Sequence, residues 1–454
     1  MKLFAAHALL PGGWAANVGI EVDEDGSITA VEPGTAAGEA GVLPGPVVPA
    51  MPNLHSHAFQ RALAGRTGRP SANRDDSFWT WRQAMYAFLD RVDADAFEAI
   101  AAQAYVEMAR AGYSCVAEFH YVHHDPAGRP YDDPAELALR VVAAAHAAGL
   151  GLTLLPVFYA HGGFGGAPAA EGQRRFVHTP DTFARLHARL RAAAPARGYV
   201  LGVAPHSLRA VTGEELVEVV RLADPGAPIH IHAAEQTREV DECYAWSGLR
   251  PVEWLVAQAH VDARWCVVHA THMTEREVEA LAASRAVAGL APTTEADLGD
   301  GTFPGAAFLA AHGRFGVGSD SNTEISPFAE LRQLEWSQRM RARRRNVLAV
   351  EGTASLGTAL WAAAAAGGAQ ALAQPVGAIA AGRRADLVVL DTRDPALGGQ
   401  AVDDVLDAAI FGPCRQPVRD VLRGGRFIVR DGRHAQEAAI LARYRAALER
   451  LAAP

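Results

Sequence analysis

Pro52-Asn53-Leu54-His55-Ser56-His57 follows directly on an apolar run at residues 47–51, and the two segments together predict a buried strand with a polar end. Side-chain direction alternates along a strand, so a His-x-His at the strand end places both imidazoles on one side. Two imidazoles where a strand gives way to a loop make half of a zinc site. The pair alone is a weak signal, because 18 histidines in 454 residues give roughly 0.7 such pairs by chance. His230 and His232 form a second pair, so further ligands and a scaffold must come from the rest of the chain.

Length and composition indicate a globular enzyme. A chain of 454 residues can hold one large α/β domain and a smaller one, and 50% hydrophobic with 20% charged residues argues against disorder. No apolar run is long enough to predict a membrane span. The net charge of −9 disfavours nucleic-acid binding, so the expected partner is a small molecule. Four scattered cysteines without a CxxC motif predict reduced thiols in a cytoplasmic protein.

Strand-like segments at both ends of the chain predict a second, smaller domain. They cover residues 2–5, 15–22, 28–31, 385–390 and 418–430. Because the strands at either end are too few to bury a core alone, we expect residues 1–46 and 376–434 to form one small β-sandwich. Residues 47–375 are then inserted as a large domain, and residues 435–454 follow as a C-terminal helix.

The inserted region alternates apolar strand-like runs with amphipathic helical ones. The predicted strands are residues 47–51, 115–121, 151–159, 198–205, 228–232, 264–269, 286–291 and 314–318. The helical patterns are residues 93–111, 133–148, 181–194, 213–222, 251–258, 274–283, 305–311, a segment from Pro327 onward, and 353–372. Eight βα units of this kind predict a TIM-like (β/α)8 barrel. A doubly wound open sheet is the alternative, but it usually carries a glycine-rich fingerprint where this chain has His-Ser-His.

Polar residues follow the predicted strands at their carboxyl ends, where barrel enzymes carry their chemistry. These residues are His55 and His57 after the first strand, Tyr121 after the second, His206 after the fourth, His232 and Glu235 after the fifth, His269 after the sixth and Asp320 after the eighth. Polar side chains brought to one rim by independent strands are hard to explain as core filling. The pattern therefore predicts an active site at this rim.

Four of these residues predict a catalytic metal site. His55, His57, His232 and Asp320 offer three nitrogens and one carboxylate oxygen and leave a position for water, which is the open geometry of catalytic zinc. His230 competes for the fifth-strand position but lies one pleat deeper, so we favour His232. Fe2+ or Mn2+ would also suit such a ligand set.

Two further residues are candidates for proton transfer. Glu235 lies three residues after His232, far enough to reach over the metal and shuttle a proton between water and a leaving nitrogen. The alternative is a carboxylate that only favours the N-terminus of the following helix. His269 could take a proton from the water or polarise the bond under attack, and it shares the role of base with Asp320.

The sequence resembles the amidohydrolase superfamily over essentially its whole length. The resemblance is carried by His55-Ser56-His57, His232-Ala233-Ala234-Glu235, His269, Gly318-Ser319-Asp320 and residues 377–391. With no lysine near the fourth strand end, it implies the mononuclear, deaminase-like branch. A closer similarity is to the formimidoylglutamate deiminases of bacterial histidine degradation. That similarity rests on residues 53–63, 78–82, 118–124, 204–211 and 232–236.

The closer resemblance implies a homodimer and the hydrolysis of N-formimino-L-glutamate to N-formyl-L-glutamate and ammonia. Arg82 and Arg209 are forked donors suited to the two carboxylates of this anionic substrate, and Gln60, Tyr121 and His206 can add hydrogen bonds. Two other interpretations remain open for the arginines, namely a surface salt bridge for Arg209 and stacking on Trp79 and Trp81 for Arg82. The functional alternatives are a deaminase of guanine or an adenosine derivative and a catalytically silent scaffold.

Overall fold

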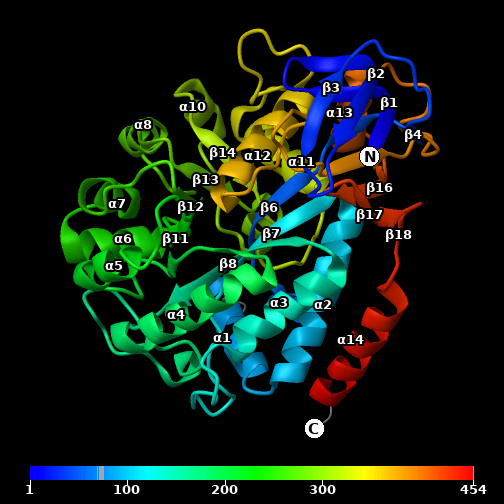
Figure 1. The fold of residues 1–454 in the computed structure, drawn as a ribbon. Coiled ribbons are helices and arrows are strands. Elements are labelled where there is room, and N and C mark those ends of the chain that lie inside the picture. Colours follow the sequence, from blue (N-terminus) through cyan, green and yellow to red (C-terminus); the bar gives the residue numbers. More distant parts are fainter. Residues whose placement is uncertain (69, 71–75, 453–454) are drawn as a thin grey trace.

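The computed structural model describes residues 1–68, 70 and 76–452 and has α/β architecture (Figure 1). Strands from both ends of the chain lie together on one side of the molecule, and the remaining strands are surrounded by helices. This arrangement confirms the predicted α/β class. It also brings residues from the two ends of the chain into one hydrogen-bonded sheet.

The sheet built from the chain ends has nine strands among the described residues. They are β1 (Lys2–Leu10), β2 (Gly13–Val22), β3 (Ile28–Glu32), β4 (Gly41–Leu43), β5 (Val47–Pro49), β15 (Leu387–Leu390), β16 (Val418–Arg423), β17 (Arg426–Arg430) and β18 (Arg433–His434). The two ends meet where β5 runs parallel to β1 and antiparallel to β15. Residues from both ends of the chain share one apolar core, which includes Leu3, Ile20 and Leu422. Because the hydrogen bonds form one sheet, a sandwich of two layers stays a prediction.

The prediction of a single strand over residues 47–51 is wrong. The chain forms two strands here, β5 in the terminal sheet and β6 (Met51–Ser56) in the parallel sheet that carries His55. At the break, the backbone N–H of Ala50 donates to Asp386 O. Every residue from 47 to 56 is buried, so the run has no alternation of apolar and polar residues that could mark the break.

The strands between β5 and β15 form two parallel sheets. One contains β6, β7 (Tyr113–His120), β8 (Gly151–Phe158), β9 (Val200–Leu201) and β10 (Ala204–Pro205), and the other contains β11 (Ile229–Ala233), β12 (Trp265–His269), β13 (Val287–Leu290) and β14 (Arg314–Val317). The predicted fourth strand is therefore two short strands, interrupted at Gly202. A side chain at Gly202 would lie 2.5 Å from Pro228 O, so only glycine permits this close approach.

Backbone hydrogen bonds join the two parallel sheets at both of their edges. At one edge, Asp320 N donates to His55 O at 3.0 Å and His57 N donates to Asp320 O at 2.9 Å. At the other edge, His230 N donates to Val203 O at 3.1 Å and His232 N donates to His206 O at 3.0 Å. The turn after β14 is thereby held next to the end of β6, and β11 is held next to the segment that contains β10.

Helices connect and cover these strands. The structure has α1 (Phe78–Leu89), α2 (Ala94–Ala111), α3 (Glu136–Ala148), α4 (Pro180–Arg197), α5 (Gly213–Val220), α6 (Thr237–Ser247), α7 (Pro251–Gln258), α8 (Glu275–Ser284), α9 (Pro292–Leu298), α10 (Gly305–Ala310), α11 (Pro327–Ala342), α12 (Leu356–Leu372), α13 (Val405–Phe411) and α14 (Glu437–Ala452). Among these, α1, α6, α9 and α13 are missing from the predicted helices. None of the helices in the described part of the chain is both long and apolar enough to cross a membrane.

Three buried histidines lie outside the predicted metal site, and we expect them to make the folded protein less stable in acid. Burial lowers the pKa of both His120 and His178 to about 3 and that of His123 well below its usual range. In the unfolded chain each imidazole takes up a proton below about pH 6.5, whereas the folded chain resists this. The free energy of unfolding should therefore fall by about 1.4 kcal/mol per pH unit and per histidine as the pH drops below that value.

His178→Gln tests this prediction, since glutamine keeps a polar group for Thr182 Oγ1, which lies 3.0 Å from His178 Nδ1. We expect urea unfolding of the variant between pH 7.5 and pH 5.5 to lose less stability than the wild type. Equal losses in the two proteins would contradict the proposed contribution of His178.

Candidate active site

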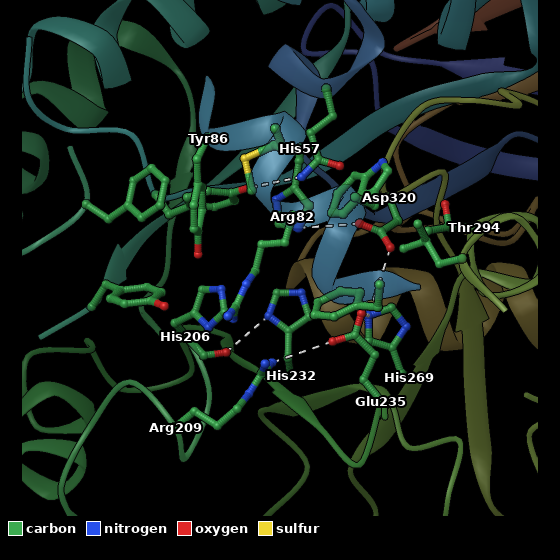
Figure 2. Close-up of a pocket in the computed structure, with 18 residues that line it drawn as sticks. His57, Arg82, Tyr86, His206, Arg209, His232, Glu235, His269, Thr294 and Asp320 are labelled. Atoms are coloured by element: carbon green, nitrogen blue, oxygen red, sulfur yellow. Dashed lines mark hydrogen bonds and ion pairs between the residues drawn. The ribbon is translucent and has the colours of Figure 1, made fainter. Parts of the chain in front are cut away.

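Three imidazoles converge at the carboxyl ends of the parallel strands. His55 Nε2 and His232 Nε2 lie 3.1 Å apart, and His57 completes a group whose ligand atoms all lie within 4.8 Å of one another. Asp320 Oδ1 lies 3.4 Å from His57 Nε2 and 3.5 Å from His55 Nε2. Figure 2 shows His57, His232 and Asp320 facing the same cavity. The structure thus brings the four predicted ligands together from β6, β11 and the turn after β14.

Backbone carbonyls orient two of these imidazoles. His57 Nδ1 lies 3.0 Å from Phe119 O, and His232 Nδ1 lies 3.1 Å from His206 O. A carbonyl oxygen only accepts, so both Nδ1 atoms donate and both Nε2 atoms keep a lone pair that points into the cluster. Burial lowers the pKa of His55 to about 3 and so favours the neutral imidazole.

The donor set fits a divalent cation. Two imidazole nitrogens lie 3.1 Å apart in a buried site, and a divalent cation can bind both of them together with His57. Burial opposes ionisation of Asp320, yet the neighbouring His55 and His57 hold the pKa of its carboxyl below the usual range. Neutral imidazoles and an ionised carboxylate are the forms in which these side chains bind metals.

The second histidine of the His230/His232 pair has a different environment. His230 is fully buried, and its Nε2 donates to Ala371 O of α12 at 2.8 Å. That bond holds the ring against α12 and away from the three-imidazole cluster, which contains His232. His230 and His232 therefore lie at different depths along β11, and only His232 reaches the imidazole cluster.

The backbone is strained at two strand ends that carry site residues. His269 at the end of β12 has φ 67°, and Asp320 after β14 has φ 42°, both in the left-handed region that side chains disfavour. Gly318 has no Cβ, which lets the turn lie directly against His55: a Cβ there would come within 2.6 Å of His55 O. The turn after β14 therefore depends on the hydrogen bonds to β6.

His269 lies among three carboxylates. Its Nε2 is 3.7 Å from Glu235 Oε1 and 3.9 Å from Asp320 Oδ2, and its Nδ1 is 3.4 Å from Glu295 Oε1. Burial alone would lower the pKa of His269, but these carboxylates raise it to about 10. Burial also raises the pKa of Glu235, so this carboxyl holds a proton more readily than an exposed glutamate.

Two guanidinium groups occupy the other side of the cavity (Figure 2). Arg82 comes from α1, and Arg209 comes from the segment after β10, where its Nη2 lies 3.6 Å from Glu235 Oε2. The Nε atoms of both arginines are buried without a hydrogen-bond partner among the described residues. Gln60 Nε2 donates to Tyr121 Oη at 2.8 Å, which leaves Gln60 Oε1 buried and unpartnered there as well.

One cavity gathers nearly all predicted site residues. Those that line it are His57, Gln60, Arg82, Tyr121, His206, Arg209, His232, Glu235, His269 and Asp320. His55 is fully buried next to His57 and His232. The remaining lining residues are Phe78, Trp81, Met85, Tyr86, Tyr159, Phe176, Thr294 and Leu298.

Sequence reasoning missed the helix that forms one wall of the cavity and two buried carboxylates. Phe78, Trp81, Met85 and Tyr86 recur with the period of an amphipathic helix, and this signal could have revealed α1. Glu239 lies four residues after Glu235, and its Oε2 accepts the Glu235 N–H at 3.0 Å. The other carboxylate, Glu295, belongs to α9, where no sequence motif relates it to His269.

The chain belongs to the amidohydrolase family, whose model matches residues 43–428. A second family model, described as the N-terminal domain of formimidoylglutamate deiminase HutF, matches residues 2–41. The formimidoylglutamate deiminase of Pseudomonas aeruginosa is 54% identical over 435 residues, which cover 96% of each chain. A 5-methylthioadenosine/S-adenosylhomocysteine deaminase of Natronomonas pharaonis is 31% identical over 231 residues, or 50% of this chain and 52% of that one.

Solved structures share the fold. An amidohydrolase from Brucella melitensis is 49% identical, superposes with a TM-score of 0.94 and is covered over 100% of both chains. An adenosine deaminase from Xanthomonas campestris with bound zinc is 23% identical and has a TM-score of 0.81 over 99% of this chain and 98% of that one. At this identity, the second likeness is one of fold alone.

Gly318→Ala tests whether the contact between the β14 turn and β6 holds the cluster together. The added Cβ meets His55 backbone atoms, so overpacking should cost about 1–3 kcal/mol and displace His55 or Asp320. We expect a lower melting temperature and a lower metal content per chain. Gly12→Ala is the matched control, because a Cβ at Gly12 meets nothing within 4 Å. A fully metallated Gly318→Ala variant with unchanged stability would contradict this role.

Proposed function

We propose that this chain is a metal-dependent hydrolase that deiminates N-formimino-L-glutamate and releases N-formyl-L-glutamate and ammonia. One observation carries the assignment: two arginines whose Nε atoms are buried and unpartnered among the described residues share a cavity with the three-imidazole cluster. Such a cavity suits a substrate with two carboxylates and a bond to be hydrolysed. The 54% identity to a formimidoylglutamate deiminase supports the same substrate.

The substrate is bound through its charged and polar groups. Arg82 and Arg209 receive the two carboxylates, because planar guanidinium forks bind carboxylates in bidentate fashion. Gln60 Oε1, which is buried and unpartnered, accepts an N–H of the formamidine. Tyr121 and His206 add hydrogen bonds beside it.

His55, His57, His232 and Asp320 would hold the divalent cation that this donor set fits. When bound there, the cation would supply Lewis-acid chemistry and lower the pKa of a water molecule at the site. The three imidazoles support zinc, although Fe2+ and Mn2+ suit similar ligands. The chain's own residues then have to orient the formamidine and move two protons.

Asp320 and Glu235 carry out the proton transfers, and His269 stabilises charge. Asp320 accepts a proton from the attacking water, whose oxygen adds to the formimino carbon. His269, an imidazolium at neutral pH because its pKa is raised to about 10, stabilises the negative charge that develops on the added oxygen as it loses its proton. Glu235, whose pKa burial raises, first gives its proton to the imino nitrogen. It then takes the proton of the added hydroxyl and passes it to the resulting amino nitrogen. The proton that Asp320 took from the water returns to Glu235 afterwards, which restores both carboxyl groups. The C–N bond breaks, ammonia leaves, and the carbon keeps the oxygen as a formyl group.

We further propose that the two parallel sheets close into a (β/α)8 barrel, supported by the hydrogen bonds at both of their edges. The terminal sheet would be a separate unit, with its boundary after Pro49 because β5 pairs with β1 and β15. A cytoplasmic homodimer, with neither nucleic acid nor a membrane as partner, is the form in which we expect the enzyme to act. The homodimer rests on the family resemblance.

A substrate panel tests the proposed function. We expect N-formimino-L-glutamate to release ammonia and N-formyl-L-glutamate, measured by coupled ammonia assay and mass spectrometry, while guanine and adenosine derivatives stay unchanged. Activity should disappear on chelation and return with zinc, because the cation supplies the Lewis acid. An inert formimino compound together with turnover of a nucleobase would overturn the assignment. Inactivity on the whole panel with metal bound would favour a silent scaffold.

Glu235→Gln tests the proton shuttle. Glutamine keeps the size of the side chain but cannot transfer a proton, so kcat should fall by about 10²–10⁴. Metal content, measured by mass spectrometry, should persist, since Glu235 lies outside the imidazole cluster. Glu214→Gln, at an exposed position in the first turn of α5, serves as control. A fully active Glu235→Gln enzyme would exclude the shuttle role.

A further inference from the structure

Trp79 contacts both arginines of the cavity. The Cζ atom of Arg82 lies 4.5 Å from the centre of the Trp79 ring, and that of Arg209 lies 5.8 Å from it. Cations within about 6 Å of an aromatic ring are attracted by its quadrupole. One indole therefore stabilises two like charges that would otherwise repel each other across the cavity.

The attraction leaves the hydrogen-bond donors of Arg82 free. A ring attracts the guanidinium as a cation and takes none of its N–H groups, which lie in the guanidinium plane and bind carboxylates edge-on. Arg82 has no ion pair or hydrogen bond among the described residues, and its contacts there include Trp79 and the Tyr86 ring at 5.8 Å. An acidic partner of Arg82 would have occupied the guanidinium N–H groups that a substrate carboxylate needs. An aromatic partner orients the side chain without this competition.

The position of Trp79 is itself fixed by its neighbours. Trp79 and Arg82 are three residues apart on α1, which places them on one helix face. The buried Phe78 ring packs edge-on against the indole, at 5.2 Å between centroids. Arg238, from the first turn of α6, lies 4.5 Å from the same indole, and its Nε donates to Glu242 Oε1 at 2.6 Å. The indole is thus contacted from α1, α6 and the segment after β10.

We propose that Trp79 is a positioning residue that determines specificity for a dicarboxylate. It holds Arg82 and Arg209 at a fixed separation, with the donors of Arg82 free and Arg209 Nε unpartnered among the described residues, so that two carboxylates on one substrate can be bound together. The inference rests on the proposed function, since it assigns to Trp79 the alignment of the two carboxylate-binding groups. The stacking of Arg82 on Trp79 and the binding of a carboxylate by Arg82 are then two parts of one arrangement.

Trp79→Leu should raise KM for N-formimino-L-glutamate about 3- to 30-fold, as expected for a lost cation–π contact, with kcat changed less than about twofold. Trp79→Phe keeps an aromatic face and should restore most of the affinity. The preference for the dicarboxylate over its two monoamides should shrink in Trp79→Leu. Trp336→Leu is the matched control, because it removes an indole that lies 5.7 Å from Arg332 Cζ on α11.

A double-mutant cycle with Arg82→Met separates positioning from a general loss of structure. If Trp79 acts through Arg82, adding Trp79→Leu to Arg82→Met should change KM far less than it does in the wild type. Additive effects, an unchanged KM, or a fall in kcat at constant KM would overturn the proposal. Thermal unfolding of each variant identifies any that fold poorly.

Binding of glutarate, a dicarboxylate without the formimino group, separates this proposal from the assigned reaction. Calorimetry should show weaker glutarate binding to Trp79→Leu than to the wild type or Trp336→Leu. If the wild-type enzyme does not turn over N-formimino-L-glutamate but shows this glutarate pattern, the proposed function fails and the role of Trp79 stands. If the wild type turns the substrate over while Trp79→Leu binds both compounds normally, the role of Trp79 fails alone.

Discussion

The backbone contact between the β14 turn and β6 is the constraint on which the active site depends. Asp320 N and O both hydrogen-bond to β6, and Gly318 lets the turn lie against His55 without steric conflict. These bonds join the first and last parallel strands, which are far apart in sequence. Because Asp320 has an unfavourable φ of 42°, the turn keeps its shape only while the β6 contacts hold it.

The cavity holds groups of both charges. The carboxylates of Glu235, Glu295 and Asp320 surround His269, whereas the guanidinium groups come from Arg82 and from Arg209, whose Nη2 lies 3.6 Å from Glu235 Oε2. The arginine side attracts anionic groups of a substrate, and the carboxylate side is equipped for proton transfer. In our proposal, one substrate spans both sides, which places its formamidine at the metal and its carboxylates at the guanidiniums.

The rim residues were predictable because parallel strands all end at one edge of the fold. Counting strand ends was enough to select His232, Glu235, His269 and Asp320, and the structure places all four around one cavity. Glu295 could not be found this way. It contacts His269 from α9, and no periodic sequence pattern relates the two residues. The boundary between β5 and β6 was also missed, because a run buried on both sides gives no alternation.

By itself, the sequence determined the α/β alternation, the strand ends and the types of chemical group that gather there, since these follow from local periodicity and strand direction. Only the tertiary structure decided which of these groups contact one another and which of them are protonated. His230 and His232 have similar sequence surroundings, yet one ring bonds a carbonyl of α12 and the other joins His55 and His57. Trp79 likewise contacts Arg209 only because α1 packs against the segment after β10. Such contacts depend on packing between distant segments, which no local pattern encodes.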